Sequence, residues 1–215
     1  RQINKRIRNE DLLEGCRRAF RRGFSRVKLY FLCGLPGERE ADLAGIVELA
    51  EDISRLGREV QGKPAAVTAS VSNFVPKPHT PYQWHAMQTR DYFESAHRFL
   101  KTRRHMRSVQ VKCHPVESSL LEGVMARGDH RLADAIERAW RKGCRFDGWG
   151  DQLDSATWWQ VFRETGVDVD EILHRERDAA TLLPWDHIGI RQGRQYLERE
   201  RQRAASEVIS LLNGE

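Results

Sequence analysis

Apolar and polar positions follow two different periodicities in the first part of the chain. Residues 9–22 place a row of apolar or small side chains on one face at helical spacing, namely Leu12, Leu13, Cys16, Ala19 and Phe20. A near-continuous apolar run at residues 26–33 favours a strand that is covered on both faces. A second helical pattern begins at about Arg39, continues to Leu56 and is expected to end at Gly57.

Two further strand patterns and one helical pattern complete this half of the chain. Residues 65–74 read as a strand that runs into the proline-rich segment VPKPHTPYQW. A helix is expected from Thr89 to about His105, and a short strand at residues 108–114. Helices and strands therefore alternate, which predicts an α/β fold with a parallel sheet and covering helices, open or part of a barrel.

From about residue 115 the pattern is helical, and five helices with no strand are predicted. Within this half the segment CRFDGW is expected to form a turn that anchors the helical half on the α/β half, with Phe146 and Trp149 as packing anchors. The change of pattern predicts two domains, an α/β domain over residues 1–114 and a helical domain over residues 115–215.

Composition and charge limit the class of protein. A chain of 215 residues with 40% apolar content can bury a substantial core. No apolar run approaches membrane-spanning length, so no membrane partner is expected. The formal net charge of +5 is mild and leaves a nucleic-acid partner open. Four dispersed cysteines without a CxxC pair favour a reducing, cytoplasmic setting.

The segment GLPGE at residues 34–38 separates the first predicted strand from the following helix. Gly34 permits close approach of a ligand to the backbone, and Pro36 fixes the turn. The spacing matches neither a dinucleotide-binding GxGxxG motif nor a P-loop, so spacing alone is explained by a tight strand-to-helix connection. The segment SNFVPKPHTPYQW follows the next strand. In a parallel sheet both segments are expected at the edge where ligands bind.

The two segments together resemble the radical S-adenosylmethionine (SAM) enzymes. KLYFLCGLPGE is similar to the fifth-strand motif of that family, especially to its GFPGE form in methylthiotransferases, and NFVPKPHTP is similar to the end of the sixth strand. NKRIRNEDLLEG, CRFDGW and LPWDHI extend the resemblance to the uncharacterised branch that carries a cobalamin-binding domain ahead of the radical SAM domain. The resemblance implies the C-terminal half of a partial TIM barrel, followed by a helical region.

The resemblance also implies cofactor-binding residues. Those of the fifth-strand SAM motif are Leu32, Gly34 and Glu38. Those that flank the adenine at the end of the sixth strand are Asn73, Phe74 and Val75. Tyr30 stands where the motif has its first glycine, and Glu38 lies one residue farther from Gly34 than the strict spacing. Glu38 therefore has two possible roles, in the SAM motif or as an acidic residue that favours the helix N-terminus.

Radical SAM chemistry requires a [4Fe-4S] cluster held by a CxxxCxxC loop, and its open iron binds SAM and reduces it to a deoxyadenosyl radical. The four dispersed cysteines of this chain do not form such a loop, and no metal ligand is predicted here. The resemblance places the loop, and a cobalamin domain, in a missing N-terminal part of the same protein. The chain is thus expected to be a C-terminal fragment of a radical SAM enzyme, inactive alone, with its catalytic residues unassigned.

The substrate stays open, with RNA or protein as candidates. A second hypothesis is a non-catalytic basic module that binds RNA or a partner protein. A basic run near the N-terminus favours it, formed by Arg17, Arg18, Arg21, Arg22 and Arg26. Basic side chains gathered on one face would support the module, whereas the enzyme needs a ligand site at the strand ends.

Overall fold

The computed structural model describes residues 7–213, except for the side chains of residues 211–213. The chain clusters into two compact units. The first comprises Arg1–Asn73 and Asp91–His114, and the second comprises Phe74–Arg90 and Pro115–Glu215. One division therefore falls after residue 114, where the sequence predicts a domain boundary. Residues 74–90, which the sequence places with the α/β domain, cluster with the second unit.

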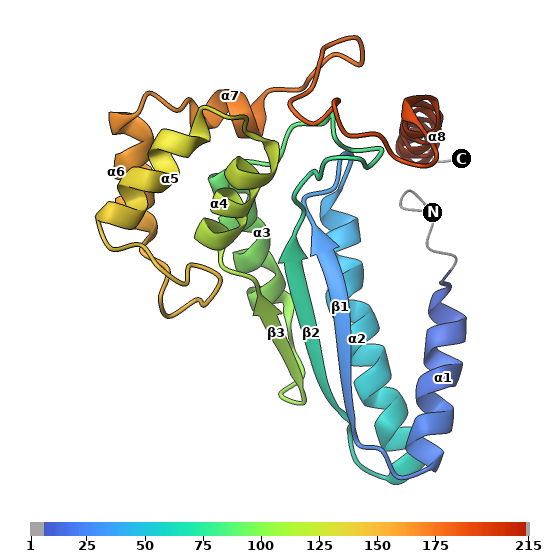
Figure 1. Ribbon diagram of the computed structural model, residues 1–215. Coiled ribbons are helices and arrows are strands. Elements are labelled where there is room, and N and C mark those ends of the chain that lie inside the picture. The colour runs from blue at the N-terminus through green and yellow to red at the C-terminus, as the bar shows by residue number, and fades with distance from the viewer. Residues whose placement is uncertain (1–6, 214–215) are drawn as a thin grey trace. The chain divides into compact units, whose positions relative to one another are not determined.

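Helices and strands alternate in the first unit, as the sequence predicts (Figure 1). Its elements are α1 (Asn9–Arg21), β1 (Arg26–Cys33), α2 (Glu40–Gln61), β2 (Ala66–Asn73), α3 (Arg90–Arg103) and β3 (Val109–Cys113). The three strands form one parallel sheet in the order β1-β2-β3. The α/β class and the parallel sheet are therefore confirmed.

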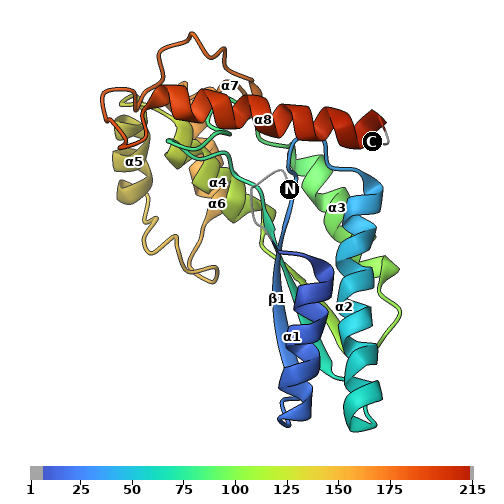
Figure 2. The ribbon, with the colours of Figure 1, turned by 90° about the vertical axis from the view of Figure 1, so that its right-hand side faces the viewer.

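The sheet buries one set of alternating side chains and exposes the other. In β1, Leu29 and Cys33 are buried, whereas Tyr30 between them is 74% exposed. The expectation that β1 is covered on both faces is therefore wrong, because an apolar run does not reveal which faces receive a neighbour. Helices α2 and α3 lie on the same side of the strands (Figure 2). Side chains on the other face are exposed or half-exposed, as Lys28 and Thr68 are.

The prediction that α2 ends at Gly57 is also wrong. The helix continues to Gln61 and ends at Gly62, which has a φ of +78° and is therefore left-handed. Gly57 lies inside the helix, where a Cβ atom would be 2.5 Å from both the backbone nitrogen and the Cβ of Ala65. The glycine allows the helix to pass close to the segment that enters β2.

The second unit is helical apart from its loops. Its helices are α4 (Val116–Arg127), α5 (Leu132–Arg141), α6 (Ser155–Glu164), α7 (Val169–His174) and α8 (Arg194–Asn213). A core cluster of Trp84, Leu183, Trp185 and Leu197 joins the loop after β2 to the segment before and inside α8. In the part of the chain that the structure describes, no helix combines the length and the apolar content of a membrane span.

The two aromatic residues of the CRFDGW segment do not pack within the second unit, since Phe146 and Trp149 are 73% and 68% exposed. Their expected role in anchoring the helical half on the α/β half stays a prediction. Phe146 has a φ of +59°, so its backbone is in the left-handed region of a turn. The turn is present as predicted, but it directs both aromatic side chains away from the core.

Candidate functional site

The segment after β1 forms a tight, glycine-dependent turn. Gly34 has a φ of +92° and Gly37 a φ of +76°, values that favour glycine because no Cβ is present to clash. The backbone N–H of Glu38 donates to the carbonyl oxygen of Leu35 at 3.0 Å and closes the turn. The sequence therefore meets the geometric requirement for an abrupt exit from the strand, at a glycine that is itself buried.

The side chain of Glu38 turns back and holds this turn in place. The backbone N–H of Gly34 donates to Glu38 Oε1 at 2.8 Å, and the hydroxyl of Tyr92 on α3 donates to the same oxygen. Burial raises the pKa of Glu38, the bonds from Tyr92 and Gly34 oppose the rise, and the charge of Asp42 adds to it. The net pKa is above the ordinary value of 4.5, so the folded protein disfavours the ionised carboxylate.

Replacement of Glu38 by glutamine is expected to change the pH dependence of stability. Because the folded pKa is raised, wild type loses stability as pH rises from 4.5 through the folded value. The substituted glutamine side chain retains an oxygen acceptor but does not ionise. The free energy of unfolding of Glu38→Gln minus that of wild type, measured by urea denaturation, should therefore be more positive at pH 8 than at pH 4.5.

The matched control is Glu40→Gln, which removes an exposed carboxylate from the first turn of α2. This variant should show a smaller change relative to wild type between the two pH values. A difference between Glu38→Gln and wild type that is constant with pH, or that reverses, would contradict the buried environment assigned to Glu38.

Asn73, the last residue of β2, joins the ends of all three strands to α3. Its Nδ2 donates to the carbonyl oxygen of His114 at 3.2 Å, directly after β3. Its Oδ1 lies 2.7 Å from Nε2 of His97 on α3 and 3.6 Å from Sγ of Cys33 at the end of β1. The side chain is only 5% exposed, so these bonds form away from solvent.

The protonation of this network follows from its geometry. Oδ1 of Asn73 accepts, because its Nδ2 donates to a carbonyl, and Nε2 of His97 therefore carries the hydrogen. Burial lowers the pKa of His97, and the charges of Lys101 and His114 lower it further. The imidazole is thus held neutral as a hydrogen-bond donor.

Tyr92 and His97 were not among the residues predicted from the sequence. His97 does follow a recognisable signal, since Phe93, Ala96, His97 and Leu100 are all buried and share the inward face of α3. Tyr92 is half-buried and gives no such signal, because its contact with Glu38 depends on how α3 packs beside the end of β1.

The cysteines of the first unit are protonated thiols, of which Cys16 and Cys33 are buried and Cys113 is half-buried. Burial, followed by the charges of Glu38 and Cys113, raises the pKa of Cys33 to about 12. Burial also raises the pKa of Cys113 and of Cys16. Thiolates are the form that binds iron. Among residues 7–213 no group of three or more His, Cys, Asp or Glu side chains is arranged to hold a metal ion.

The remaining predicted site residues lie in both units. Leu32 is on the exposed face of β1, one residue before Cys33. Phe74 and Val75 belong to the second unit, where the Phe74 ring packs edge-to-face on Tyr82 with 5.2 Å between centroids. Val75 is buried and lies next to Gly123 of α4.

The structure therefore brings together part of the predicted set. Gly34 and Glu38 are in direct contact, and the β1–β2 register pairs Cys33 with Asn73. The GLPGE turn and the segment that begins at Phe74 thus each leave the sheet after the same pair of residues, at its carboxyl end.

Comparisons with known proteins extend over part of the chain. No protein-family model matches it, and no solved structure matches it. The uncharacterized protein MJ0966 of the archaeon Methanocaldococcus jannaschii is similar, with 24% identity over 135 residues, which are 63% of this chain and 28% of that protein. The match covers less than a third of the relative, whose name states no activity.

Proposed function

We propose that this chain is the C-terminal half of a radical SAM barrel and supplies part of its SAM-binding surface. The observation that carries the proposal is a parallel sheet with helices on one face, an exposed second face, and a glycine-dependent turn at its carboxyl end. In a barrel the second face is the interior, and ligands bind at the carboxyl ends of the strands. A half-barrel accounts for all three features.

The residues at this end fit the adenosine part of SAM. Gly34 is buried and its N–H is bonded to Glu38, so its proposed part is the absence of a Cβ at the end of the strand. Leu32, two residues earlier, presents an apolar side chain on the exposed face. The carboxylate of Glu38 accepts from Gly34 and Tyr92, so its proposed role is to shape the turn. The amide of Asn73 is engaged in the core, so Asn73 is included on the resemblance. Phe74 and Val75 are included on the resemblance alone.

The [4Fe-4S] cluster does not fit residues of this chain. Its ligands are thiolates in a short loop, whereas Cys33 is a buried and Cys113 a half-buried thiol, both with raised pKa values and on separate strands. The proposal therefore assigns the cluster, and any cobalamin, to another part of the polypeptide and derives no catalytic step from this chain.

The decisive experiment determines the mass of the polypeptide in its native cell, isolated with an antibody against this chain, and its iron and acid-labile sulfide. The expected result is a polypeptide much heavier than this chain that carries iron. A polypeptide of about this length without iron would contradict the proposal and favour a binding module.

In the heavier polypeptide, Leu32→Asp is expected to lower SAM affinity about tenfold or more, which corresponds to ~1.4 kcal/mol. The reason is that a charge replaces an apolar contact beside the adenine. Thr68→Asp is the matched control, because Thr68 lies on the same exposed face but nearer the amino ends of the strands. Equal effects of the two variants on calorimetrically measured SAM affinity would contradict the assignment of Leu32.

One observation favours the second candidate function, a basic module that binds RNA. The exposed sheet face contains the basic residues Arg26, Lys28 and Lys112 and no acidic residue. Nζ of Lys28 lies 4.9 Å from the ring centroid of the exposed Tyr30. Aromatic and basic side chains together on a sheet are typical of surfaces that bind single-stranded RNA. The mass and iron measurement separates this candidate from the enzyme.

A further inference from the structure

The second unit contains a fully buried arginine with an incomplete set of partners. Arg127, the last residue of α4, is 0% exposed. Its Nε donates to the carbonyl oxygen of Ile172 at 3.0 Å and its Nη1 to that of Gln83 at 3.4 Å. Its Nη2 is buried and has no hydrogen-bond partner among the described residues. Burial, followed by the charge of Arg177, lowers the pKa of Arg127 to about 10.

Arg177 is a second cation next to it. Its backbone N–H donates to the carbonyl oxygen of Trp84 at 2.8 Å, and its Nη2 donates to the carbonyl oxygen of Arg127 at 2.9 Å. Its Nη1 is buried without a partner in the described part of the chain. Its guanidinium carbon lies 5.3 Å from the ring centroid of Trp185. Two guanidinium groups thus share one site, and each keeps an unused donor.

The carboxylates nearest to these arginines are engaged elsewhere. Burial lowers the pKa of Arg177, and the charges of Glu171 and Asp129 oppose this, which places both carboxylates in its neighbourhood. Asp129 pairs with Arg131, whose Nη2 lies 2.7 Å from Oδ2, and Glu171 pairs with Arg175 at 2.7 Å. Neither Arg127 nor Arg177 has an ion pair with any described carboxylate. Burial of such charges without a counter-ion is costly.

The indole of Trp84 adds a third unused donor in the same region. Its Nε1 is buried without an acceptor among residues 7–213. Trp84 adjoins Gln83, whose carbonyl accepts from Arg127, and its own carbonyl accepts from Arg177. The guanidinium carbon of Arg201 on α8 lies 5.6 Å from its ring centroid, so a further cation is close.

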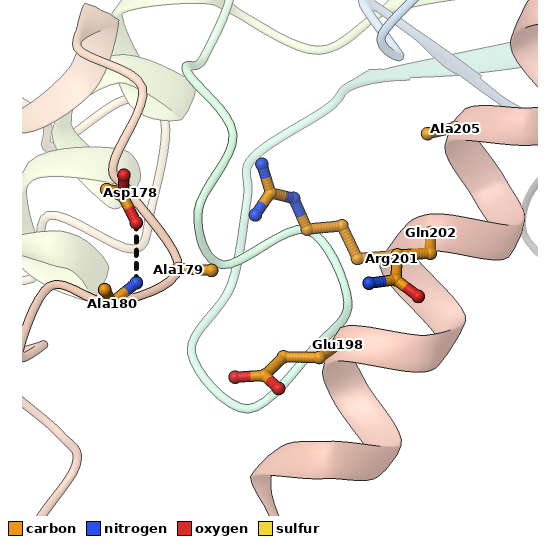
Figure 3. A pocket seen from close by; sticks show the side chains of 7 residues that line it. All are labelled: Asp178, Ala179, Ala180, Glu198, Arg201, Gln202 and Ala205. Carbon is orange, nitrogen blue, oxygen red and sulfur yellow. Dashed lines mark hydrogen bonds between the residues drawn. The ribbon is translucent and has the colours of Figure 1, made fainter.

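A pocket is lined in part by the residues that follow Arg177 in the chain (Figure 3). Its volume is about 620 Å³, and its lining residues are Asp178, Ala179, Ala180, Glu198, Arg201, Gln202 and Ala205. The first three directly follow Arg177 in the chain. Figure 3 shows Arg201 extending from α8 toward the facing loops, while the carboxylate of Asp178 is turned to the backbone N–H of Ala180 at 2.7 Å.

We propose that Arg127 and Arg177 bind a phosphate group, entering beside residues 178–180. Two unpaired cations match the charge of a phosphate, which is nearly a dianion at pH 7 and accepts several hydrogen bonds at once. The unused N–H groups of both guanidinium groups supply donors of the planar kind that phosphate sites use. The site lies wholly in the second unit and is independent of the SAM-binding proposal.

The test is isothermal titration calorimetry of the intact chain with inorganic phosphate at constant ionic strength, supported by thermal unfolding in phosphate and in chloride. Wild type should bind phosphate and melt at a higher temperature in phosphate than in chloride. Arg177→Gln should weaken phosphate affinity at least about tenfold, since charge-assisted hydrogen bonds are lost. The substituted glutamine side chain keeps an amide donor for the carbonyl of Arg127, so the variant is expected to fold.

The matched control is Arg175→Gln, which removes an exposed arginine two residues earlier that is paired with Glu171. Its phosphate affinity should equal that of wild type. Adenosine monophosphate is titrated in parallel: tighter binding than phosphate assigns the site to an organic phosphate, and equal or weaker binding assigns it to the free ion. Absence of phosphate binding, or equal affinity in wild type and Arg177→Gln, would overturn the proposal.

Discussion

Replacement of Asn73 by leucine is expected to lower the free energy of unfolding of the first unit by about 2–4 kcal/mol. Leucine has nearly the same shape but neither donates nor accepts. His97 Nε2 and Cys33 Sγ would lose their shared acceptor in a buried setting, and the carbonyl oxygen of His114 would lose a donor in a half-buried one. Each buried polar group deprived of a partner costs about 1–3 kcal/mol, and the costs do not add fully.

The measurement is urea denaturation followed by circular dichroism, together with amide hydrogen exchange of peptides from the three strands. All six tryptophans lie in the second unit, so their fluorescence does not report on the first. Ser72→Ala is the matched control, because Ser72 is the preceding residue of β2 and lies half-exposed on the opposite face. It should change stability by less than about 0.5 kcal/mol. If Asn73→Leu changed the free energy of unfolding as little as Ser72→Ala, the hydrogen bonds of Asn73 would not hold the strand ends together.

The order of elements was predictable from the sequence because it depends on local periodicity. The alternation of helices and strands, the parallel sheet, and the final helix over residues 194–213 are as expected. The sequence also offers Asp154 or Ser155 as the N-cap of α6, and the structure shows Asp154, whose side chain accepts from the backbone N–H of Thr157. The helices, the strands and the cap are each determined by residues close together in the chain, whereas the parallel pairing was inferred from the alternation of helices and strands.

The failures concern features that depend on distant residues. The apolar run of β1 does not reveal that Tyr30 and Lys28 face away from the helices, because that depends on where helices pack. Phe146 and Trp149 are large and apolar, yet the backbone of the turn directs them outward. Size and polarity predict burial only on average.

The residues of the candidate site were likewise predictable only where they lie close together in the chain. Gly34 and Glu38 were found from a short motif, and they are in contact as a motif of adjacent residues allows. Tyr92 comes from an element more than fifty residues later and reaches Glu38 only through tertiary packing. A hydrogen-bond partner chosen by packing leaves no periodic signal in a single sequence.

Replacement of Gly57 by alanine is expected to destabilise the first unit by about 2 kcal/mol, although alanine is the better helix former. The added Cβ would lie 2.5 Å from the backbone nitrogen and the Cβ of Ala65. Ala65 is not free to move away, because its N–H donates to the carbonyl oxygen of Ser54 at 3.1 Å and its carbonyl accepts from Ser54 Oγ at 2.8 Å. Overpacking of this kind costs about 1–3 kcal/mol and exceeds the helix-propensity gain of about 1 kcal/mol.

Gly45→Ala, in the same helix, is the matched control for Gly57→Ala. No atom lies within 4 Å of a Cβ at that position, so the substitution should raise the free energy of unfolding by about 0.5–1 kcal/mol. The two variants make the same chemical change in one helix and differ in the neighbour that they meet, so opposite signs in urea denaturation would identify the contact with Ala65 as the cause. If both variants were stabilised, the segment between α2 and β2 would have moved to make room for the added Cβ. Gly57 would then not be required for the close approach of α2 to Ala65.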